Sequence, residues 1–563
     1  MQKTQRHRFD AIVVGSGITG GWAAKELTER GLRTLVLEAG RNIEPGTDYT
    51  EHVQAWQLPF RGYGDRRQLE ATQPIQKNCY ACDEWGSKFF VNDIENPYSF
   101  DADKPFHWIR GRHVGGRSIT WGRQVYRWSD LDFEANLKDG HGVDWPIRYA
   151  DIAPWYSYVE KFIGITGLAE GLAQLPDGEF LPAMEFKCAE LRVREAAQKA
   201  WGRDRVLTIG RAAILTRNHN GRAACHYCGP CERGCATHSY FSSLGSTLPA
   251  ARKTGRMTLR PNSVVERVTY DPKTGRATGV RVIDAVTMEA IEFSGRLVFL
   301  CASALESTRI LMHSTSEHWP TGMANASGAL GKYVMDHCFG AGARGTFEGM
   351  EDQAAFGNRP NGVYVPRFRN VTDAHPKFVR GYGFQGGAGR SGWGRGGTGF
   401  GAGYKQALIE QKGPWTMGLG GWGEMLPRSD NYLELDPAAK DKWGIPSLRI
   451  HCTHGPNEKA ILEDVQQTAA EMLEAAGAKN ITTYDSHLPP GLCIHEMGTA
   501  RMGRHAKTSV LNGWNQAHDI PNLFVTDGAC MTSSANQNPS ITYMALTARA
   551  VAHAVDLINR GEL

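Results

Sequence analysis

Four of the twelve cysteines lie close together in the chain, at Cys225, Cys228, Cys231 and Cys235. The C-x2-C-x2-C-x3-C spacing is the one with which bacterial iron–sulfur proteins hold a cluster, except that Ala236 stands where a proline usually follows. Four thiolates can also hold zinc, and two crowded disulfides are conceivable. Twelve cysteines are too few for a disulfide framework in 563 residues. The clustering therefore predicts a metal site, with an iron–sulfur cluster favoured.

A glycine motif near the N-terminus predicts a dinucleotide site. It reads Gly15-Ser16-Gly17-Ile18-Thr19-Gly20, follows an apolar run at 9–14 and precedes a helical pattern. Glycines let the backbone approach a pyrophosphate at the positive end of a helix. Glu38 ends a second apolar run, 23 residues after Gly15, and can bond to a ribose hydroxyl. We expect cofactor contacts from Gly15, Gly17, Ile18, Thr19, Gly20 and Glu38. The alternative is a glycine-rich turn with a structural acid, and the motif alone does not choose between NAD and FAD.

The C-terminal end of the chain favours FAD. A strand-like run at 522–526 leads into Asp527-Gly528, and a helical pattern follows from about 540 to 558. Two pieces of a nucleotide-binding fold at opposite ends of one chain suggest one domain assembled from both. The helix N-terminus near Pro539 would offer partial positive charge to a reduced, anionic flavin.

The composition of the chain excludes several classes of protein. The chain is 41% hydrophobic and 22% charged, which excludes a disordered or collagen-like chain. A net charge of +4 argues against a nucleic-acid partner recognised by bulk charge. The most apolar stretch, 297–312, is broken by Glu306 and Arg309, so no direct membrane span is expected. The N-terminus has neither a long apolar signal region nor a twin-arginine pair.

Taken together, the motifs resemble the glucose–methanol–choline (GMC) oxidoreductase family over nearly the whole chain. Besides both ends, the resemblance rests on Val114–Ser118, Leu300–Ser307, His495-x-x-Gly498-Thr499 with Met502-Gly503, and Asn538-Pro539, in the family's order. It implies an α/β fold, α+β overall, in a two-domain flavoprotein. A discontinuous Rossmann-like FAD domain would span 1–60, 100–135, 240–338 and 490–563. A connecting region with the cysteines would span 136–239, and a sheet-based substrate domain 339–489.

The resemblance makes His495 the base that takes the hydroxyl proton of an alcohol, a role that suits imidazole with its ordinary pKa near 6.5. Asn538 matches the position of a second histidine or asparagine, where an amide can stabilise the developing alkoxide. Because asparagine cannot be a general base, His495 should be the sole base. On the residues alone, His495 is one of 19 histidines, Asn538 could simply cap the last helix, and Asn536 is a neighbouring rival.

Further flavin contacts follow from the same resemblance, at Gly115, Gly116, Ser118, Thr120, Val265, Ala302, Asp527, Gly528, Asn538 and Pro539. Some family members carry a histidine at the position of Thr120 and bond it covalently to FAD. Threonine cannot form that bond, so we expect non-covalent FAD. Sugar recognition needs paired hydrogen bonds and an aromatic face, for which Gln537, Glu496 and Trp121 are candidates.

Within the family, the cysteine spacing and overall length resemble the iron–sulfur-containing bacterial sugar dehydrogenases, most of all the glucoside 3-dehydrogenase catalytic subunit. This resemblance implies oxidation of a ring C3 hydroxyl to a 3-keto sugar. It also implies a 3Fe-4S cluster on three cysteines, or a 4Fe-4S cluster, that passes electrons to a cytochrome c subunit. A small export or chaperone-like subunit would carry the chain to the periplasm, the cytoplasm being the alternative. An oxygen-using sugar oxidase like pyranose oxidase, another dehydrogenase such as gluconate 2-dehydrogenase, and a flavin-fold subunit without chemistry remain alternatives.

Overall fold

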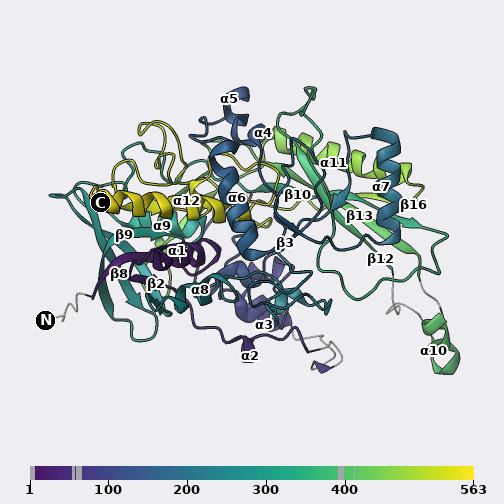
Figure 1. The fold of residues 1–563 in the computed structure, drawn as a ribbon, viewed down its shortest axis with the longest axis horizontal. Helices are drawn as coiled ribbons and strands as arrows, with labels where there is room; N and C mark the ends of the chain where they lie inside the picture. Colours follow the sequence, from purple (N-terminus) through teal and green to yellow (C-terminus); the bar gives the residue numbers. More distant parts are fainter. Residues whose placement is uncertain (1–6, 54–56, 59–65, 391–398, 411–412) are drawn as a thin grey trace.

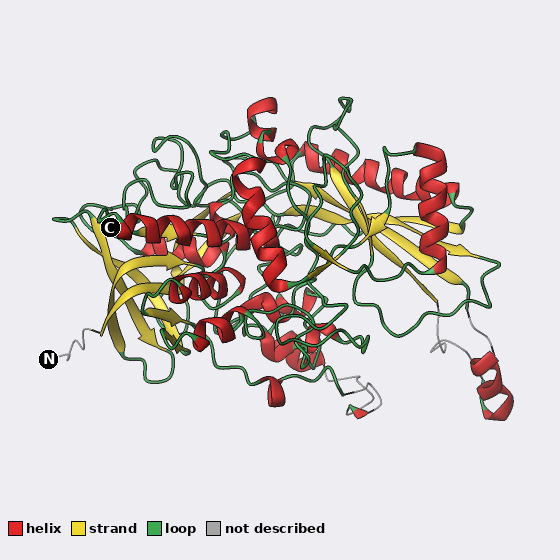
Figure 2. Cartoon of the chain, in the orientation of Figure 1, coloured by secondary structure: helices red, strands yellow, loops and turns green. Residues whose placement is uncertain are grey.

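The computed structural model describes residues 7–53, 57–58, 66–390, 399–410 and 413–563. Two large sheets lie towards opposite ends of the elongated molecule, and helices lie along and between them (Figures 1 and 2). The first sheet contains β1 (His7–Val14), β2 (Thr34–Leu37), β6 (Met257–Arg260), β7 (Ser263–Asp271), β8 (Arg276–Asp284), β9 (Ala290–Leu300) and β17 (Leu523–Val525).

The parallel part of the first sheet runs in the order β6-β2-β1-β9-β17, the strand pattern of a dinucleotide-binding fold. One edge of β9 is shared, because residues 290–294 pair with antiparallel β8 and residues 298–300 pair with parallel β17. A strand from the C-terminal end thus completes the sheet that the N-terminal strand begins. The mixed α/β class predicted from the sequence is confirmed.

The alternation of side chains along β1 explains how both faces of this sheet are covered. Ala11 and Val13 face a core shared with α1 (Ile18–Glu29), α8 (Thr247–Lys253) and α12 (Ser540–Asn559). Ile12 and Val14 face the core that contains α9 (Ala304–His313). By length and composition α12 could cross a membrane, with a mean hydropathy of 1.2, yet 72% of that window is buried inside the protein. It is packed as a core helix.

The second large sheet is antiparallel, with the order β16-β10-β13-β12-β11-β5. Its strands are β5 (Thr208–Ile209), β10 (His337–Phe347), β11 (Val363–Val365), β12 (Tyr382–Arg390), β13 (Trp415–Glu424) and β16 (Lys479–Asp485). Strand β5 comes from the region that the sequence predicted to be only a connection. On one face lie α11 (Pro456–Ala475) and α7 (Cys188–Trp201). A Cβ on Gly421 would lie 2.5 Å from Val465 of α11, so glycine lets this helix approach the sheet.

The remaining elements are short or lie around the two sheets. Two small sheets pair β3 (Ile165–Thr166) with β4 (Phe180–Leu181), and β14 (Tyr432–Lys440) with β15 (Pro446–His451). The other α-helices are α2 (Pro45–Asp48), α3 (Arg66–Thr72), α4 (Asp130–Phe133), α5 (Ala135–Asp139), α6 (Tyr149–Ile163) and α10 (Gly401–Glu410).

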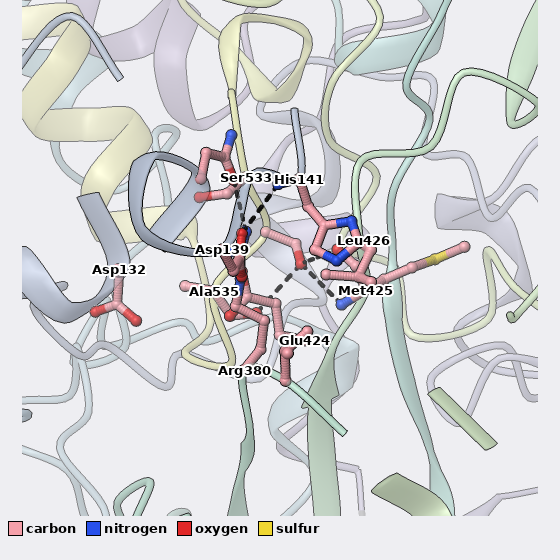
Figure 3. A network of polar contacts seen from close by, with 12 residues as sticks. Asp132, Asp139, His141, Arg380, Glu424, Met425, Leu426, Ser533 and Ala535 are labelled. Atoms are coloured by element: carbon pink, nitrogen blue, oxygen red, sulfur yellow. Dashed lines mark hydrogen bonds and ion pairs between the residues drawn. The ribbon is translucent and has the colours of Figure 1, made fainter. Parts of the chain in front are cut away.

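A buried charge network ties α5 to the second sheet (Figure 3). The guanidinium of Arg380 bonds to both Asp139 and Glu424, and its Nη2 donates to Asn136 Oδ1 at 2.8 Å. Glu424 is fully buried, so its charge depends on Arg380 for compensation. This network fixes the loop around residue 140 against the end of β13.

Candidate active site

A cavity of about 510 Å³ lies where residues from both large sheets meet. It is large enough to take a sizeable part of a cofactor and its substrate. Among the residues singled out in the sequence, the following line it: Gly15, Gly17, Ile18, Thr19, Glu38, Gly116, Ser118, Thr120, Trp121, Val265, Ala302, His495, Glu496, Asp527, Gly528, Asn538 and Pro539. Gly20, Gly115 and Gln537 do not line it.

The glycine loop before α1 is shaped for a closely approaching ligand. A Cβ on Gly15 would lie 2.4 Å from the carbonyl oxygen of Cys301, so only glycine allows this contact between loop and strand. A Cβ on Gly17 would meet nothing within 4 Å, which leaves the start of α1 open to the cavity. Gly20 serves packing, because its Cβ would lie 1.9 Å from the oxygen of Gly15. The loop fits a pyrophosphate at a helix N-terminus.

Glu38 lies at the end of β2 and lines the cavity. Its Oε2 accepts from the Ser16 hydroxyl at 2.6 Å, and its Oε1 accepts from the Gly40 amide at 2.9 Å. Burial raises the pKa of this carboxyl. The hydroxyl of Ser16 accepts in turn from the Gly115 amide at 3.0 Å, so Gly115 orders the loop from outside the cavity. An acid at this place can accept from a ribose hydroxyl.

The opposite wall contains the N-terminus of α12, where Asn538, Pro539, Ser540 and Tyr543 line the cavity. The partial positive charge of a 20-residue helix is directed there. The hydroxyl of Tyr543 is buried and has no hydrogen-bond partner within the described part of the chain. A buried, unpartnered hydroxyl beside an open cavity is expected where a bound group supplies the missing partner. These donors and shapes fit a flavin dinucleotide.

His495 and Asn538 meet at this wall. Asn538 Nδ2 lies 3.3 Å from His495 Nε2, and the Oδ1 of Asn538 accepts from Gln385 Nε2 at 2.7 Å. The backbone amide of His495 donates to Asp336 Oδ1 at 3.0 Å. Burial, with a smaller effect of the positive charge of Arg117, lowers the pKa of His495 well below its ordinary value. A neutral imidazole is therefore available at neutral pH.

Asn536, the neighbouring rival, points elsewhere. It is 2% exposed, does not line the cavity, and its Nδ2 donates to the Tyr364 hydroxyl at 3.3 Å. Of the two asparagines, only Asn538 lines the cavity.

The three substrate candidates from the sequence have different surroundings. Trp121 lines the cavity, and its indole N–H donates to the carbonyl of Phe241 at 2.9 Å. Glu496 also lines it, but both of its oxygens accept from Arg117, at 3.1 and 2.8 Å. Gln537 is turned away from the cavity and donates to Asp132 Oδ2 at 3.2 Å. The structure thus offers no substrate contact for Gln537, and it commits Glu496 to an ion pair.

Three residues of the second large sheet also line the cavity. Phe339 of β10 and Trp422 of β13 are paired across the sheet, with stacked rings whose centroids are 6.1 Å apart. Both line the cavity, as does Gln385 of β12. The sequence pointed to none of them, because the pairing of the strands, rather than a local motif, brings them together. The only local hint was an aromatic residue within a glycine-rich strand.

His337 also approaches His495, with 2.8 Å between their Nδ1 atoms. Together with the Cys493 sulfur, these atoms form a group within 4.8 Å that resembles a metal site. Two imidazole nitrogens on one zinc ion would be roughly 3.3 Å apart, given zinc–nitrogen bonds of about 2.0–2.1 Å in a tetrahedron. The observed 2.8 Å is instead the length of a hydrogen bond. The two rings therefore share a proton.

The four clustered cysteines line a second, smaller cavity. Pro360 lines both this cavity and the large one, so the two are neighbours. Arg123 also lines the large cavity, and its Nη2 donates to the Cys231 carbonyl at 2.9 Å. Trp121 packs against the apolar group around these cysteines. Trp121 and Arg123, which follow the predicted flavin contacts Ser118 and Thr120, thus form part of the wall between the two cavities.

Gly229 and Gly234 have positive φ angles of 109° and 100°, which form the tight turns of the cysteine loop. Among the described residues, the atoms of His337, Cys493 and His495 lie close enough together for a single ion, and the four clustered sulfurs do not form such a group. The cavity that the four cysteines line is small, about 20 Å³.

Comparison with known proteins places the chain in a family. Family models described as GMC oxidoreductase match residues 9–339 and 427–547. The chain is 29% identical to 2-methyl-1,2-propanediol dehydrogenase of Mycolicibacterium austroafricanum, over 97% of this chain and 95% of that protein. It is 23% identical to the fructose dehydrogenase large subunit of Gluconobacter japonicus, over 98% of each. The solved structure of pyridoxine 4-oxidase from Mesorbium loti shares the fold, with a TM-score of 0.62 and 15% identity over 97% of this chain and 99% of that one. The chain therefore belongs to the GMC oxidoreductase family of FAD-type enzymes that act on alcohol or sugar CH–OH groups.

Proposed function

We propose that the chain is an FAD-dependent dehydrogenase that oxidises a secondary hydroxyl of a sugar or glycoside. The resemblance to glucoside 3-dehydrogenases favours the ring C3 hydroxyl, with a 3-keto sugar as product. Electrons would leave through an iron–sulfur cluster at Cys225, Cys228, Cys231 and Cys235. The observation that carries this proposal is the shared wall between the cysteine cavity and the large cavity.

The chemistry begins at the hydroxyl of the substrate. His495 Nε2 takes the proton as the O–H bond breaks, and the amide of Asn538 donates to the developing alkoxide oxygen. FAD held in this cavity would supply the acceptor for the hydride that leaves the carbon. The substrate would leave as a carbonyl compound, with its hydroxyl proton on His495.

The substrate class is supported by the aromatic pair of Phe339 and Trp422. A sugar ring presents C–H groups on one face and hydroxyls around its edge, so it can lie on an aromatic surface while polar groups bind its rim. Gln385 lies on the neighbouring strand and supplies an amide at this rim. A surface of this kind favours a ring substrate over a short-chain alcohol.

The electron path is supported by the contacts of Trp121 and Arg123 between the two cavities. An iron–sulfur cluster accepts electrons singly, whereas a reduced flavin holds a pair. We favour a 3Fe-4S cluster on three of the four cysteines, with a 4Fe-4S cluster as the second form. A cytochrome c subunit would then be the acceptor. The Gluconobacter relative is named as a large subunit, which is consistent with an assembly. A small export subunit and a periplasmic location complete the proposal.

An absorption spectrum of anaerobically purified protein tests the proposal, with iron and zinc assayed on the same sample. We expect flavin bands that bleach when a glucoside is added, over a broad iron–sulfur absorbance. Cys228→Ser should spare flavin reduction by the glucoside but slow cytochrome c reduction, and Cys452→Ser, at a buried cysteine outside both cavities, is its control. Zinc without iron, together with peroxide formed in proportion to sugar consumed, would contradict the proposal and indicate an oxidase.

A further inference from the structure

A chain of hydrogen bonds runs behind the reaction centre and ends on backbone carbonyls. His337 Nε2 lies 2.9 Å from the carbonyl oxygen of Ala535 and 3.2 Å from that of Ser534. His337 Nδ1 lies 2.8 Å from His495 Nδ1. Beyond His495, the chain continues through Asn538 to Gln385.

The direction of this chain is fixed at its His337 end. Carbonyl oxygens only accept hydrogen bonds, so the proton of a neutral His337 must lie on Nε2. Its Nδ1 is then a lone pair, and His495 must donate to it from Nδ1. The remaining nitrogen of His495, Nε2, is therefore left without a proton. The side-chain amides of Asn538 and Gln385 can be turned either way. In the orientation seen here, Gln385 donates to Asn538 Oδ1 and the NH₂ group of Asn538 faces His495 Nε2, which agrees with an unprotonated Nε2.

The surroundings keep His337 neutral. Its side chain is fully buried, and burial lowers its pKa to about 4. Asp336, the nearest residue with a carboxylate in the chain, turns its oxygens to the backbone amides of Gly491, Cys493 and His495. A cationic His337 would carry a proton on Nδ1 and would donate to His495 Nδ1. His495 would then carry its own proton on Nε2 instead.

The segment that supplies the two carbonyls, Ser534 and Ala535, is itself fixed by hydrogen bonds. The hydroxyl of Ser534 accepts from the Met425 amide at 3.0 Å and donates to the Met425 carbonyl at 3.0 Å. Met425 directly follows β13, next to Glu424 of the buried charge network (Figure 3). The acceptors for His337 are therefore fixed by the end of a strand in the second large sheet.

We infer that His337 is a positioning residue that holds His495 in the Nδ1–H tautomer, which leaves the Nε2 lone pair for a substrate hydroxyl to take the place of the Asn538 amide. After proton transfer, the same Nδ1–H bond stabilises the imidazolium without any rearrangement. A neutral histidine thus takes the orienting role that a carboxylate has in many catalytic triads. This inference rests on the proposed role of His495 as base.

The test compares His337→Gln with His337→Asn, with His313→Gln on α9 as a matched control outside the cavity. Flavin reduction by a glucoside is followed anaerobically by stopped flow. Gln cannot accept at the position of Nδ1, so the limiting rate should fall about 10²–10⁴-fold while FAD content and glucoside affinity stay unchanged. Asn places Oδ1 near that position and should recover about tenfold, the effect of one hydrogen bond to a charged group. Equal rates for His337→Gln and the wild type would overturn the inference.

The tautomer is also measured without any change at His337. Protein with ¹⁵N-labelled histidine, assigned by the signals lost in His495→Ala, should show His495 protonated at Nδ1 and unprotonated at Nε2. Protonation at Nε2 would overturn the inference even if the His337 variants do not fold. His495→Ala separates this inference from the proposed function, because retained flavin reduction in that variant would remove His495 as base whatever its tautomer.

Discussion

The guanidinium of Arg123 donates a hydrogen bond to the main-chain carbonyl of Cys231, at 2.9 Å. The same group lies 3.4 Å over the ring of Tyr240, which lines the cysteine cavity. Arg123 also lines the large cavity. One side chain thus connects the large cavity with the loop that contains the four clustered cysteines.

Arg123→Met should loosen the cysteine loop, because both the bond to Cys231 and the cation contact with Tyr240 are lost. We expect the ratio of iron to FAD to fall while the protein stays folded. Iron and flavin assays on the same sample measure it, with Arg205→Met as a control whose partner ring is Trp201 of α7. An unchanged ratio would show that Arg123 does not support the cluster.

Asn538→Ala should slow flavin reduction by about 10²–10³-fold, the cost of one donor to a developing oxyanion. Glucoside binding should change less than the rate, because the amide acts most strongly as the alkoxide forms. Anaerobic stopped flow over a range of glucoside concentrations separates the two quantities. Asn536→Ala is the matched control, and a loss of rate there instead would reassign the role to that residue.

Trp422→Leu should raise the KM for a glycoside by about tenfold, since aromatic stacking contributes beyond the buried area. The limiting rate should change little, because Trp422 binds the ring and does not touch the transferred proton. Steady-state kinetics with a glycoside and with a short diol tests the substrate class, and only the glycoside should respond. Trp514→Leu, at an exposed tryptophan that lies over Arg549, provides the control.

Local sequence patterns predicted the elements that hold the cofactor but not the full reaction centre. The apolar run at 9–14, the glycine motif and the last helix correspond to β1, the loop before α1 and α12, since each depends on neighbouring residues. His337, Gln385 and Trp422 lie on three strands of an antiparallel sheet, and only strand pairing brings them to His495. Gln537 was a candidate because it is next to Asn538, yet adjacent side chains point apart. Gln537 donates to Asp132 and does not line the cavity, whereas Gln385 of β12 does line it.

The pH dependence of flavin reduction should show an acid limb well below pH 6.5. Burial, together with the positive charge of Arg117, lowers the pKa of His495 well below 6.5. The unprotonated ring takes the substrate proton, so the rate should stay constant above pH 6.5 and fall only as the pH drops through the lowered pKa. Arg117→Gln should move the limb to higher pH, because it removes a positive charge and leaves the negative charge of Glu496 nearby. Stopped-flow rates from about pH 5 to 8 measure both profiles, with the exposed Arg560→Gln as a control. A wild-type limb near pH 7 would instead point to Asp336, which accepts from the His495 amide and whose pKa burial raises to about 7.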